Sequence, residues 1–284
     1  MFNYSNSRKC NLYDIYKSFY FHHIGKTAGT SYGKLLRSEF IKKYIFPNYG
    51  PSISVLKSNL AKYKFFTGHF PYCFVDLLPK PCFQFTMLRN PQLVVLSSYN
   101  HLTRLSGNHI SFSHRIGKPL TCFDDFLNDD VLRNNSTNPQ CFSLGNPLTT
   151  PAFVTTLISI KSGDWKRPEL PAARGLNLLM YGDRNQDKAD QKLLVNAIDR
   201  LENQFVVAGI VERNDDTKLL LKQSSGMKLE SSLSHSNVAT SEKLTLADLS
   251  TSQQDTLHSM TELDQKLYQH ADRLLTKRIN LGLT

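Results

Sequence analysis

Residues 18–36 read SFYFHHIGKTAGTSYGKLL, and the expected architecture of the chain follows from this stretch. Its first part, residues 18–24, is aromatic and apolar and predicts a short buried strand. A glycine-bounded turn follows, and residues 30–44 then carry apolar side chains at the spacing typical of a helix. A strand that runs through such a turn into a helix presents backbone N–H groups and the positive end of the helix dipole to an anion.

The turn itself carries groups that would complete an anion site. Lys26 supplies a positive charge, and Thr30 and Ser31 supply two hydroxyls at the start of the helix. In a Walker A motif the lysine follows the second glycine, whereas Lys26 precedes Gly29, so the turn does not match that motif. The candidate anion-binding residues are consecutive in the chain: Gly25, Lys26, Thr27, Ala28, Gly29, Thr30 and Ser31.

Strands and helices are expected to alternate along the rest of the chain. Short apolar runs predict further strands at residues 64–67, 82–88, 176–181 and 205–210. Helical spacing predicts helices at residues 92–105, 123–127, 187–201 and 256–279. Polar composition predicts irregular segments at residues 106–120, 133–139 and 223–242. This alternation is typical of an α/β fold with a mainly parallel sheet and helices on both faces.

The domain organisation follows from the absence of a linker-like segment. We expect an N-terminal extension at residues 1–17 and a single domain at residues 18–284, a length that can bury a sizeable core without disulfides or structural metal.

A second candidate anion site lies in residues 85–99, FTMLRNPQLVVLSSY. Arg89 leaves the end of a predicted strand, and Ser97 lies about two turns into the next predicted helix. A long arginine can give a forked contact to a phosphate while the serine donates a short hydroxyl bond to it. The alternative is that Arg89 pairs with a carboxylate and Ser97 packs within its helix.

Charge is unevenly distributed along the chain. The formal net charge is +10, and residues 1–120 contain 16 Lys or Arg residues against three acidic ones. This asymmetry favours an anionic ligand bound mainly by the N-terminal part, with a solvated basic face as the alternative. Because no dense Lys/Arg stripe with interleaved aromatic residues is present, we expect no nucleic-acid partner.

Cysteine usage and hydropathy bear on the compartment. The five cysteines form no C-x-x-C pair and show no zinc-type spacing, so we expect reduced thiols, no metal site and a cytoplasmic location. No apolar run approaches the roughly 18 residues of a membrane span. The first twenty residues contain no apolar signal-peptide region, so we expect neither a transmembrane segment nor secretion.

Four segments together resemble a known family. Their order and rough spacing are similar to those of sulfotransferases that use 3′-phosphoadenosine 5′-phosphosulfate (PAPS). Carbohydrate sulfotransferases of the heparan sulfate 2-O type, with their bacterial relatives, are the most similar group. Residues 138–140 also resemble the N-x-Q element of that family, and residues 263–279 resemble its terminal helix. The four segments are FHHIGKTAGTS (21–31), GHFPY (68–72), LRNPQLVVLSSY (88–99) and VAGIVER (207–213).

The resemblance implies a sulfotransferase fold with a P-loop-like turn, PAPS as the sulfuryl donor and its bisphosphate (PAP) as the product. It implies a hydroxyl-bearing acceptor, a carbohydrate in the most similar group, and no metal. The general base of the family falls on His69, and the lysine that assists the leaving group falls on Lys26. The implied PAPS contacts are the turn residues 25–31 together with Arg89, Ser97, Thr240 and Lys243.

Departures from the family pattern are few. Gly25 stands where proline is usual, and Asn90 stands where aspartate is usual. Leu93 and Val94 stand where a charged pair is usual. None of these changes removes a group that would bind PAPS, but those at Asn90, Leu93 and Val94 imply the loss of a structural ion pair of the family. His22 and His23, within or beside the first strand, are interpreted as structural residues.

Two other function classes stay open at this point. One is a P-loop kinase of small molecules, which would need an acidic Mg²⁺ ligand after a strand, and no clear candidate is present. The other is a non-catalytic basic module that binds sulfated or phosphorylated polymers. A Golgi-luminal enzyme is the alternative to a cytoplasmic one, and the sequence indicates neither the acceptor nor the oligomeric state.

Overall fold

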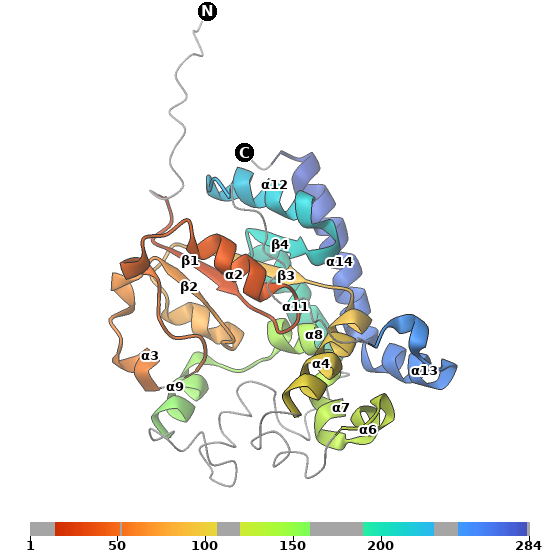
Figure 1. Cartoon of the computed structure of the whole chain (residues 1–284). Coiled ribbons are helices and arrows are strands. Elements are labelled where there is room, and N and C mark those ends of the chain that lie inside the picture. Colours follow the sequence, from red (N-terminus) through yellow and green to blue (C-terminus); the bar gives the residue numbers. More distant parts are fainter. Residues whose placement is uncertain (1–14, 52, 107–119, 160–189, 230–243, 283–284) are drawn as a thin grey trace, which may run out of the picture.

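The computed structural model describes residues 15–51, 53–106, 120–159, 190–229 and 244–282 (Figure 1). Four strands, all parallel, form one sheet in the order β2-β1-β3-β4. They are β1 (Ser18–His22), β2 (Phe65–Gly68), β3 (Cys82–Leu88) and β4 (Val207–Ile210). The prediction of an α/β fold with a parallel sheet is therefore confirmed. The strand predicted at residues 176–181 lies outside the described residues.

Both faces of the sheet are buried, which explains the aromatic strand sequences. Side chains alternate along a strand, so Phe19 and Phe21 point to one face and Tyr20 to the other. All five residues of β1 are buried. On the first face lies α2 (Gly29–Arg37), whose Tyr32 ring packs against Phe21 and Phe85 with centroids 6.5 and 5.6 Å apart. Figure 1 shows α2 crossing in front of the sheet.

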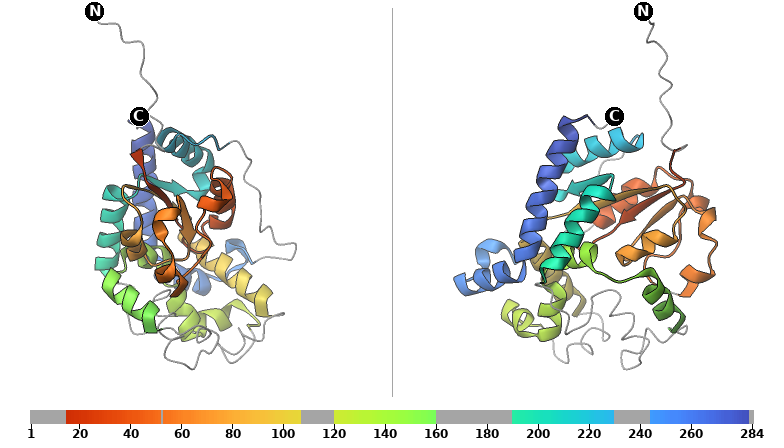
Figure 2. Two further views of the ribbon diagram at one scale, coloured as in Figure 1. Left: turned by 90° about the vertical axis from the view of Figure 1, so that its left-hand side faces the viewer. Right: turned by 180° about the vertical axis from the view of Figure 1, so that it is seen from behind.

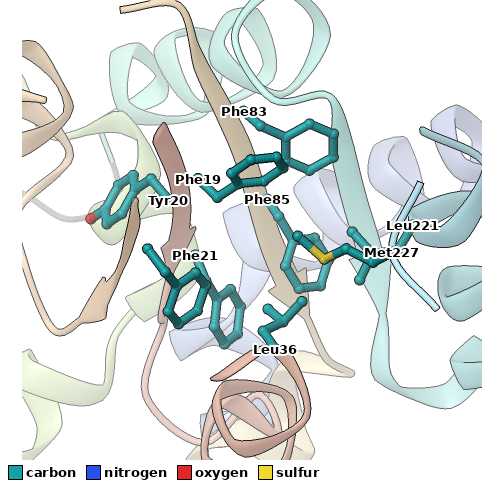
Figure 3. A pocket seen from close by; sticks show the side chains of 9 residues that line it. Phe19, Tyr20, Phe21, Leu36, Phe83, Phe85, Leu221 and Met227 are labelled. Atoms are coloured by element: carbon teal, nitrogen blue, oxygen red, sulfur yellow. The ribbon is translucent and has the colours of Figure 1, made fainter. Parts of the chain in front are cut away.

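A small cavity marks where this face meets α2 and α12 (Asn214–Ser225) (Figure 3). Its volume is about 10 Å³, which is at the lower limit for a single water molecule. Its lining is apolar, so we assign it to core packing and not to ligand binding. The lining residues are Phe19, Tyr20, Phe21, Leu36, Phe65, Phe83, Phe85, Leu221 and Met227.

The opposite face is covered by a different set of helices, shown from behind in Figure 2. The Tyr20 ring packs edge-on against Phe74, with centroids 5.7 Å apart, and His22 Nε2 lies 2.9 Å from Ser143 Oγ. Helices therefore pack on both faces of the sheet. This second set comprises η3 (Tyr72–Leu77), α8 (Pro139–Gly145), α11 (Gln191–Asn203) and α14 (Glu262–Asn280).

A second buried apolar cluster lies beside the sheet. Val95, Phe126 and Leu257 bring α4, α6 and α13 together there. The remaining helices are α3 (Ile53–Lys57), α4 (Pro91–Ser106), α6 (Phe123–Asn128), α7 (Asp130–Ser136), α9 (Thr150–Ser159) and α13 (Thr251–Met260). Single turns of 3₁₀ helix are η1 (Lys42–Tyr44), η2 (Leu60–Lys62), η5 (Val211–Arg213) and η6 (Leu246–Asp248).

Four predicted segments differ from the structure, beginning with the helix predicted at residues 30–44 and the turn predicted at residues 133–139. The helix predicted at 30–44 ends at Arg37, where the Ser38 hydroxyl donates to the Leu35 carbonyl (2.6 Å) and competes with the helical pattern. Residues 133–139 are not a turn, because α7 continues to Ser136 and α8 starts at Pro139.

The predicted helix at 256–279 is in fact two helices, α13 and α14, which meet at Thr261. The Asn138 side-chain oxygen accepts from the N–H groups of Leu263 and Asp264 at 3.0 and 3.2 Å and caps α14. The segment predicted as irregular at 223–242 begins instead inside α12, which ends at Ser225.

Neither a membrane-spanning helix nor a disulfide is found in the described ranges. No helix there is both long and apolar enough to cross a bilayer. The four cysteines in these ranges, Cys73, Cys82, Cys122 and Cys141, are free thiols.

Candidate functional site

The candidate site lies at the sheet edge where the parallel strands end. Chain order reverses between β1 and β3, because β2 pairs with the far side of β1. In open parallel sheets, ligands bind outside the carboxyl ends of the strands at such a reversal. The turn after β1 and the segment after β3 meet at this point, since Arg89 Nη1 donates to the Lys26 carbonyl at 3.2 Å.

The turn after β1 holds its shape through local contacts. Lys26 and Ala28 adopt left-handed backbone conformations, with φ of 65° and 59°. The buried Thr27 hydroxyl donates to the Ile24 carbonyl at 2.9 Å and so ties the turn to the end of the strand. A Cβ on Gly29 would overlap the ring of His23, so glycine is required there. Left-handed residues beside a helix start orient successive N–H groups toward one concave site.

The remaining predicted turn residues lie around this helix start. Gly25 and Thr30 are exposed, and Ser31 is half-buried in the first turn of α2. α2 carries no acidic residue in its first turn, so its positive dipole end is not neutralised from within the helix. The structure thus brings the whole predicted segment, residues 25–31, to one place.

The backbone of Arg89 is held in place by hydrogen bonds, whereas part of its side chain has no hydrogen-bond partner among the described residues. The buried Gln140 amide brackets it, accepting from Arg89 N and donating to Arg89 O, both at 2.9 Å. Arg89 Nε is buried and has no hydrogen-bond partner among the described residues. Burial lowers the pKa of Arg89, and the Glu212 carboxylate acts in the opposite direction. A buried guanidinium with an unused donor is a group that an anion would complete.

The positive charges around Lys26 repel one another. Burial lowers its pKa to about 8, and the charges of Arg104 and Arg89 act in the same direction. His101 has a lowered pKa through burial first and then through Lys26 and Arg104. Cations that disfavour one another's charge indicate a place where bound negative charge would be stabilised.

His101 and Arg104 were missed by the sequence analysis, although a signal existed. They follow Ser97 on α4 by four and seven residues, which places all three on one side of the helix. Ser97 is half-buried in the second turn of α4. In the described part of the chain, Arg89 is hydrogen-bonded to Gln140 and Lys26, and no hydrogen bond joins it to Ser97.

His69 follows β2 at the same edge, on the other side of β1. Its Nδ1 lies 3.1 Å from the His23 carbonyl. Because a carbonyl only accepts, Nδ1 carries the proton and Nε2 carries the lone pair. Burial lowers the pKa of His69, as does the charge of Lys26, whereas the bond to His23 raises it. His69 is therefore held neutral, in the form that can accept a proton.

His22 and His23 differ in what they contact. His22 is buried on the opposite face of the sheet, bonded to Tyr20 and Ser143, and burial lowers its pKa to about 3. His23 is also buried with a pKa of about 3, but its ring packs on His69 with centroids 4.2 Å apart. His22 is hydrogen-bonded within the core, whereas His23 belongs to the surroundings of the site.

The segment after β4 completes the edge. Glu212 accepts from the Asn90 backbone N–H at 3.0 Å and from the Tyr268 hydroxyl at 3.1 Å. Asn90, which stands where the resembling family has aspartate, accepts from the Leu93 N–H at the start of α4. Two predicted contacts, Thr240 and Lys243, lie outside the described residues.

Sequence comparisons add no identity to this geometry. No protein-family model matches the chain, and no curated protein matches it significantly. In the described part of the chain, no three His, Cys, Asp or Glu side chains are grouped so that they could hold a metal ion. The site is therefore interpreted from its own residues: a cationic turn, a partly unsatisfied arginine and a neutral histidine at one edge of a parallel sheet.

Proposed function

We propose that the protein is a PAPS-dependent sulfotransferase that moves a sulfuryl group onto a hydroxyl, with a carbohydrate as the acceptor. The observation that carries the proposal is the contact between Arg89 and the turn of Lys26. It joins two cationic elements from neighbouring parallel strands and leaves Arg89 Nε without a partner among the described residues. The family resemblance supports the same ligand, and with it the P-loop-like turn and the sulfotransferase fold.

The residues present fit a ligand with two separate anionic groups. The turn residues 25–31 and the start of α2 offer N–H groups, hydroxyls and the Lys26 charge to the 5′-phosphosulfate. Arg89 and Ser97 would hold the 3′-phosphate, and Arg89 Nε would gain its missing acceptor there. Thr240 and Lys243 are included in the proposal on the resemblance alone.

The proposed reaction uses two residues of the chain directly. His69 Nε2 takes the proton of the acceptor hydroxyl while the acceptor oxygen bonds to sulfur. The bond from sulfur to the bridging oxygen breaks, and its electron pair stays on the 5′-phosphate of PAP. Lys26 stabilises the negative charge that grows on that oxygen, so its effect is larger in the transition state than in the bound substrate.

We also propose a cytoplasmic location. The support for this location is the cysteine usage. The chain has five cysteines without C-x-x-C spacing, and the four at described positions are free thiols.

Turnover with radiolabelled PAPS tests the proposal. The full chain, with EDTA present, is incubated with a panel of hydroxyl-bearing oligosaccharides and phenols. We expect label on at least one carbohydrate. Phosphoryl transfer from ATP that requires Mg²⁺ would instead make the protein a kinase. Tight binding of anionic polymers with no transfer from PAPS would make it a binding module.

Isothermal titration tests the two-anion ligand separately. PAP carries both phosphates, whereas 5′-AMP lacks the group that Arg89 would hold. The charge-assisted bonds to Arg89 should contribute roughly 1.5–3 kcal/mol, so PAP should bind about 10–150-fold more tightly than 5′-AMP. Equal affinities would contradict the assignment of Arg89 to the 3′-phosphate.

A further inference from the structure

We propose that Tyr49 is the positioning residue for His69, acting through His23 to hold the base in one tautomer. The inference rests on the proposed function for its catalytic consequence, but its structural part does not. Tyr49 lies in the segment between α2 and α3, and neither the motifs nor the resemblance assigned it a role.

Tyr49 contacts His69 through its backbone. Its carbonyl accepts from the His69 N–H at 2.9 Å. The same carbonyl lies so close to Gly68 that a Cβ there would be 2.5 Å from it, nearer than a side chain can approach. Glycine at position 68 thus lets the Tyr49 carbonyl come close to the chain. The hydrogen bond of that carbonyl with the His69 N–H then fixes the backbone of His69.

Tyr49 also acts on the ring of His69, through a second residue. Its hydroxyl is hydrogen-bonded to His23 Nδ1 at 2.6 Å. The His23 ring is wedged between Gly29 and His69, packing on the His69 ring at 4.2 Å. The His23 carbonyl accepts from His69 Nδ1 at 3.1 Å. The Tyr49 hydroxyl thus holds the side chain of the same residue whose backbone carbonyl selects the His69 tautomer.

The arrangement suits a base because it adds no charge. His23 stays neutral, with its pKa lowered to about 3 by burial and by the neighbouring His69, His22 and Lys26. Burial raises the pKa of Tyr49, so the phenol keeps its proton. A neutral clamp restrains the His69 ring without adding a second cation beside Lys26. A loosely held imidazole would spend part of its time in the other tautomer, with a proton where the base needs its lone pair.

Tyr49→Phe is a selective test, because it removes one oxygen and retains the rest of the residue. The backbone bond to His69 does not depend on the side chain, and the ring still faces His69 and the Arg37 guanidinium. Tyr44→Phe is the matched control: Tyr44 is also an exposed tyrosine, and its ring packs against the Lys43 ammonium group.

Nitrogen-15 NMR of the histidine rings gives a readout that needs no substrate. In the wild-type protein near pH 7.5 we expect His69 with a protonated Nδ1 and an unprotonated Nε2. In Tyr49→Phe we expect a mixture of both tautomers, and in Tyr44→Phe the wild-type pattern. An unchanged His69 tautomer in Tyr49→Phe would overturn the proposal, whatever reaction the protein catalyses.

Kinetics then test the catalytic consequence. The loss of one positioning hydrogen bond should lower kcat about 5- to 10-fold, with the affinity for PAP changed less than about twofold. A lowered kcat without a change of tautomer would contradict positioning through the His69 tautomer. If the tautomer changes while even the wild-type protein fails to turn over PAPS, the clamp stands and the proposed sulfotransferase activity does not.

Discussion

His69 and Lys26 occupy the same edge of the sheet but take opposite roles with respect to protons. His69 is neutral because of burial, and its Nδ1 bond to the His23 carbonyl leaves Nε2 as the acceptor. Lys26 is useful only while it is protonated, yet burial and two arginines lower its pKa to about 8. One residue must be without its proton and the other must keep it, so the working pH range is bounded on both sides.

His69→Ala should lose turnover and keep nucleotide binding. Removal of a general base typically lowers the rate by about 10²–10⁴-fold. PAP affinity, measured by titration, should change little, because Arg89 and the turn after β1 are intact. His258→Ala, at an exposed position on α13, is the control and should keep wild-type turnover. Near-normal turnover by His69→Ala would return His69 to a structural role.

Lys26→Arg should remove the alkaline limb of the pH profile. As pH rises through about 8, Lys26 of the free protein loses its proton, so kcat/KM should fall there. Arginine keeps its charge over the accessible range, so the variant should show a plateau, at a lower rate set by its different shape. Lys26→Ala should lower kcat on the order of 10²-fold. An alkaline limb that persists in Lys26→Arg would assign it to another group.

At the scale of elements, one buried side chain connects α8 to the end of β3. Gln140 holds both backbone groups of Arg89, while its own N–H donates to the Asp264 carboxylate at 3.0 Å. Asp264 lies in the first turn of α14, and its backbone N–H donates to the Asn138 side chain in return. The starts of α8 and α14 therefore cap each other, and through Gln140 this contact sets where Arg89 points.

Gln140→Met should weaken the proposed contact of Arg89 with the 3′-phosphate while leaving the contact of the turn with the 5′-phosphate intact. Methionine keeps the length of the side chain but leaves the Arg89 N–H and carbonyl without these partners, which costs about 1–3 kcal/mol of stability. We expect PAP affinity to fall and 5′-AMP affinity to change little, since only PAP reaches Arg89. Thermal unfolding and titration measure the two effects, and Gln204→Met, at an exposed position after α11, is the control. Equal losses for both nucleotides would show that Gln140 supports the turn as well.

For the whole molecule, stability should fall on acidification. Between pH 6.5 and 3, unfolded His22 and His23 bind protons that their folded forms, with pKa values of about 3, do not. Asp264 acts oppositely below pH 6, because burial raises its folded pKa to about 6 from 3.8. Between roughly pH 6 and 4, these two histidines outweigh the one carboxyl by about 1.4 kcal/mol of unfolding free energy per pH unit. The lowered pKa values of His69 and His101 add to this loss.

Two variants separate these contributions. His22→Gln should flatten the dependence of unfolding free energy on pH, measured by urea denaturation, because one of the two proton-binding histidines is gone. Asp264→Asn should steepen the dependence, because the opposing carboxyl is gone. A slope that neither variant changes would show that surface groups control the acid response.

Local sequence was sufficient to predict the strands of the sheet, their parallel arrangement and the cationic turn. Residues 18–24 and 82–88 are short apolar runs, the first followed by Gly25 and the second preceded by Pro81. Burial on both faces leaves such runs few alternatives to a central strand. The turn at residues 25–31 could also be predicted from the sequence, because glycine spacing and a lysine between strand and helix are local properties.

What lies beside that turn depends on packing between distant parts of the chain. Tyr49, Gln140 and the α4 pair His101 and Arg104 come from three separate segments, and their contacts depend on how the chain returns to the sheet edge. The helix ends at Arg37 and Thr261 also depend on a single hydroxyl or a distant cap, which apolar periodicity does not encode. Local patterns specify which element forms, whereas the proton positions and charges of the site arise from groups that meet only after folding.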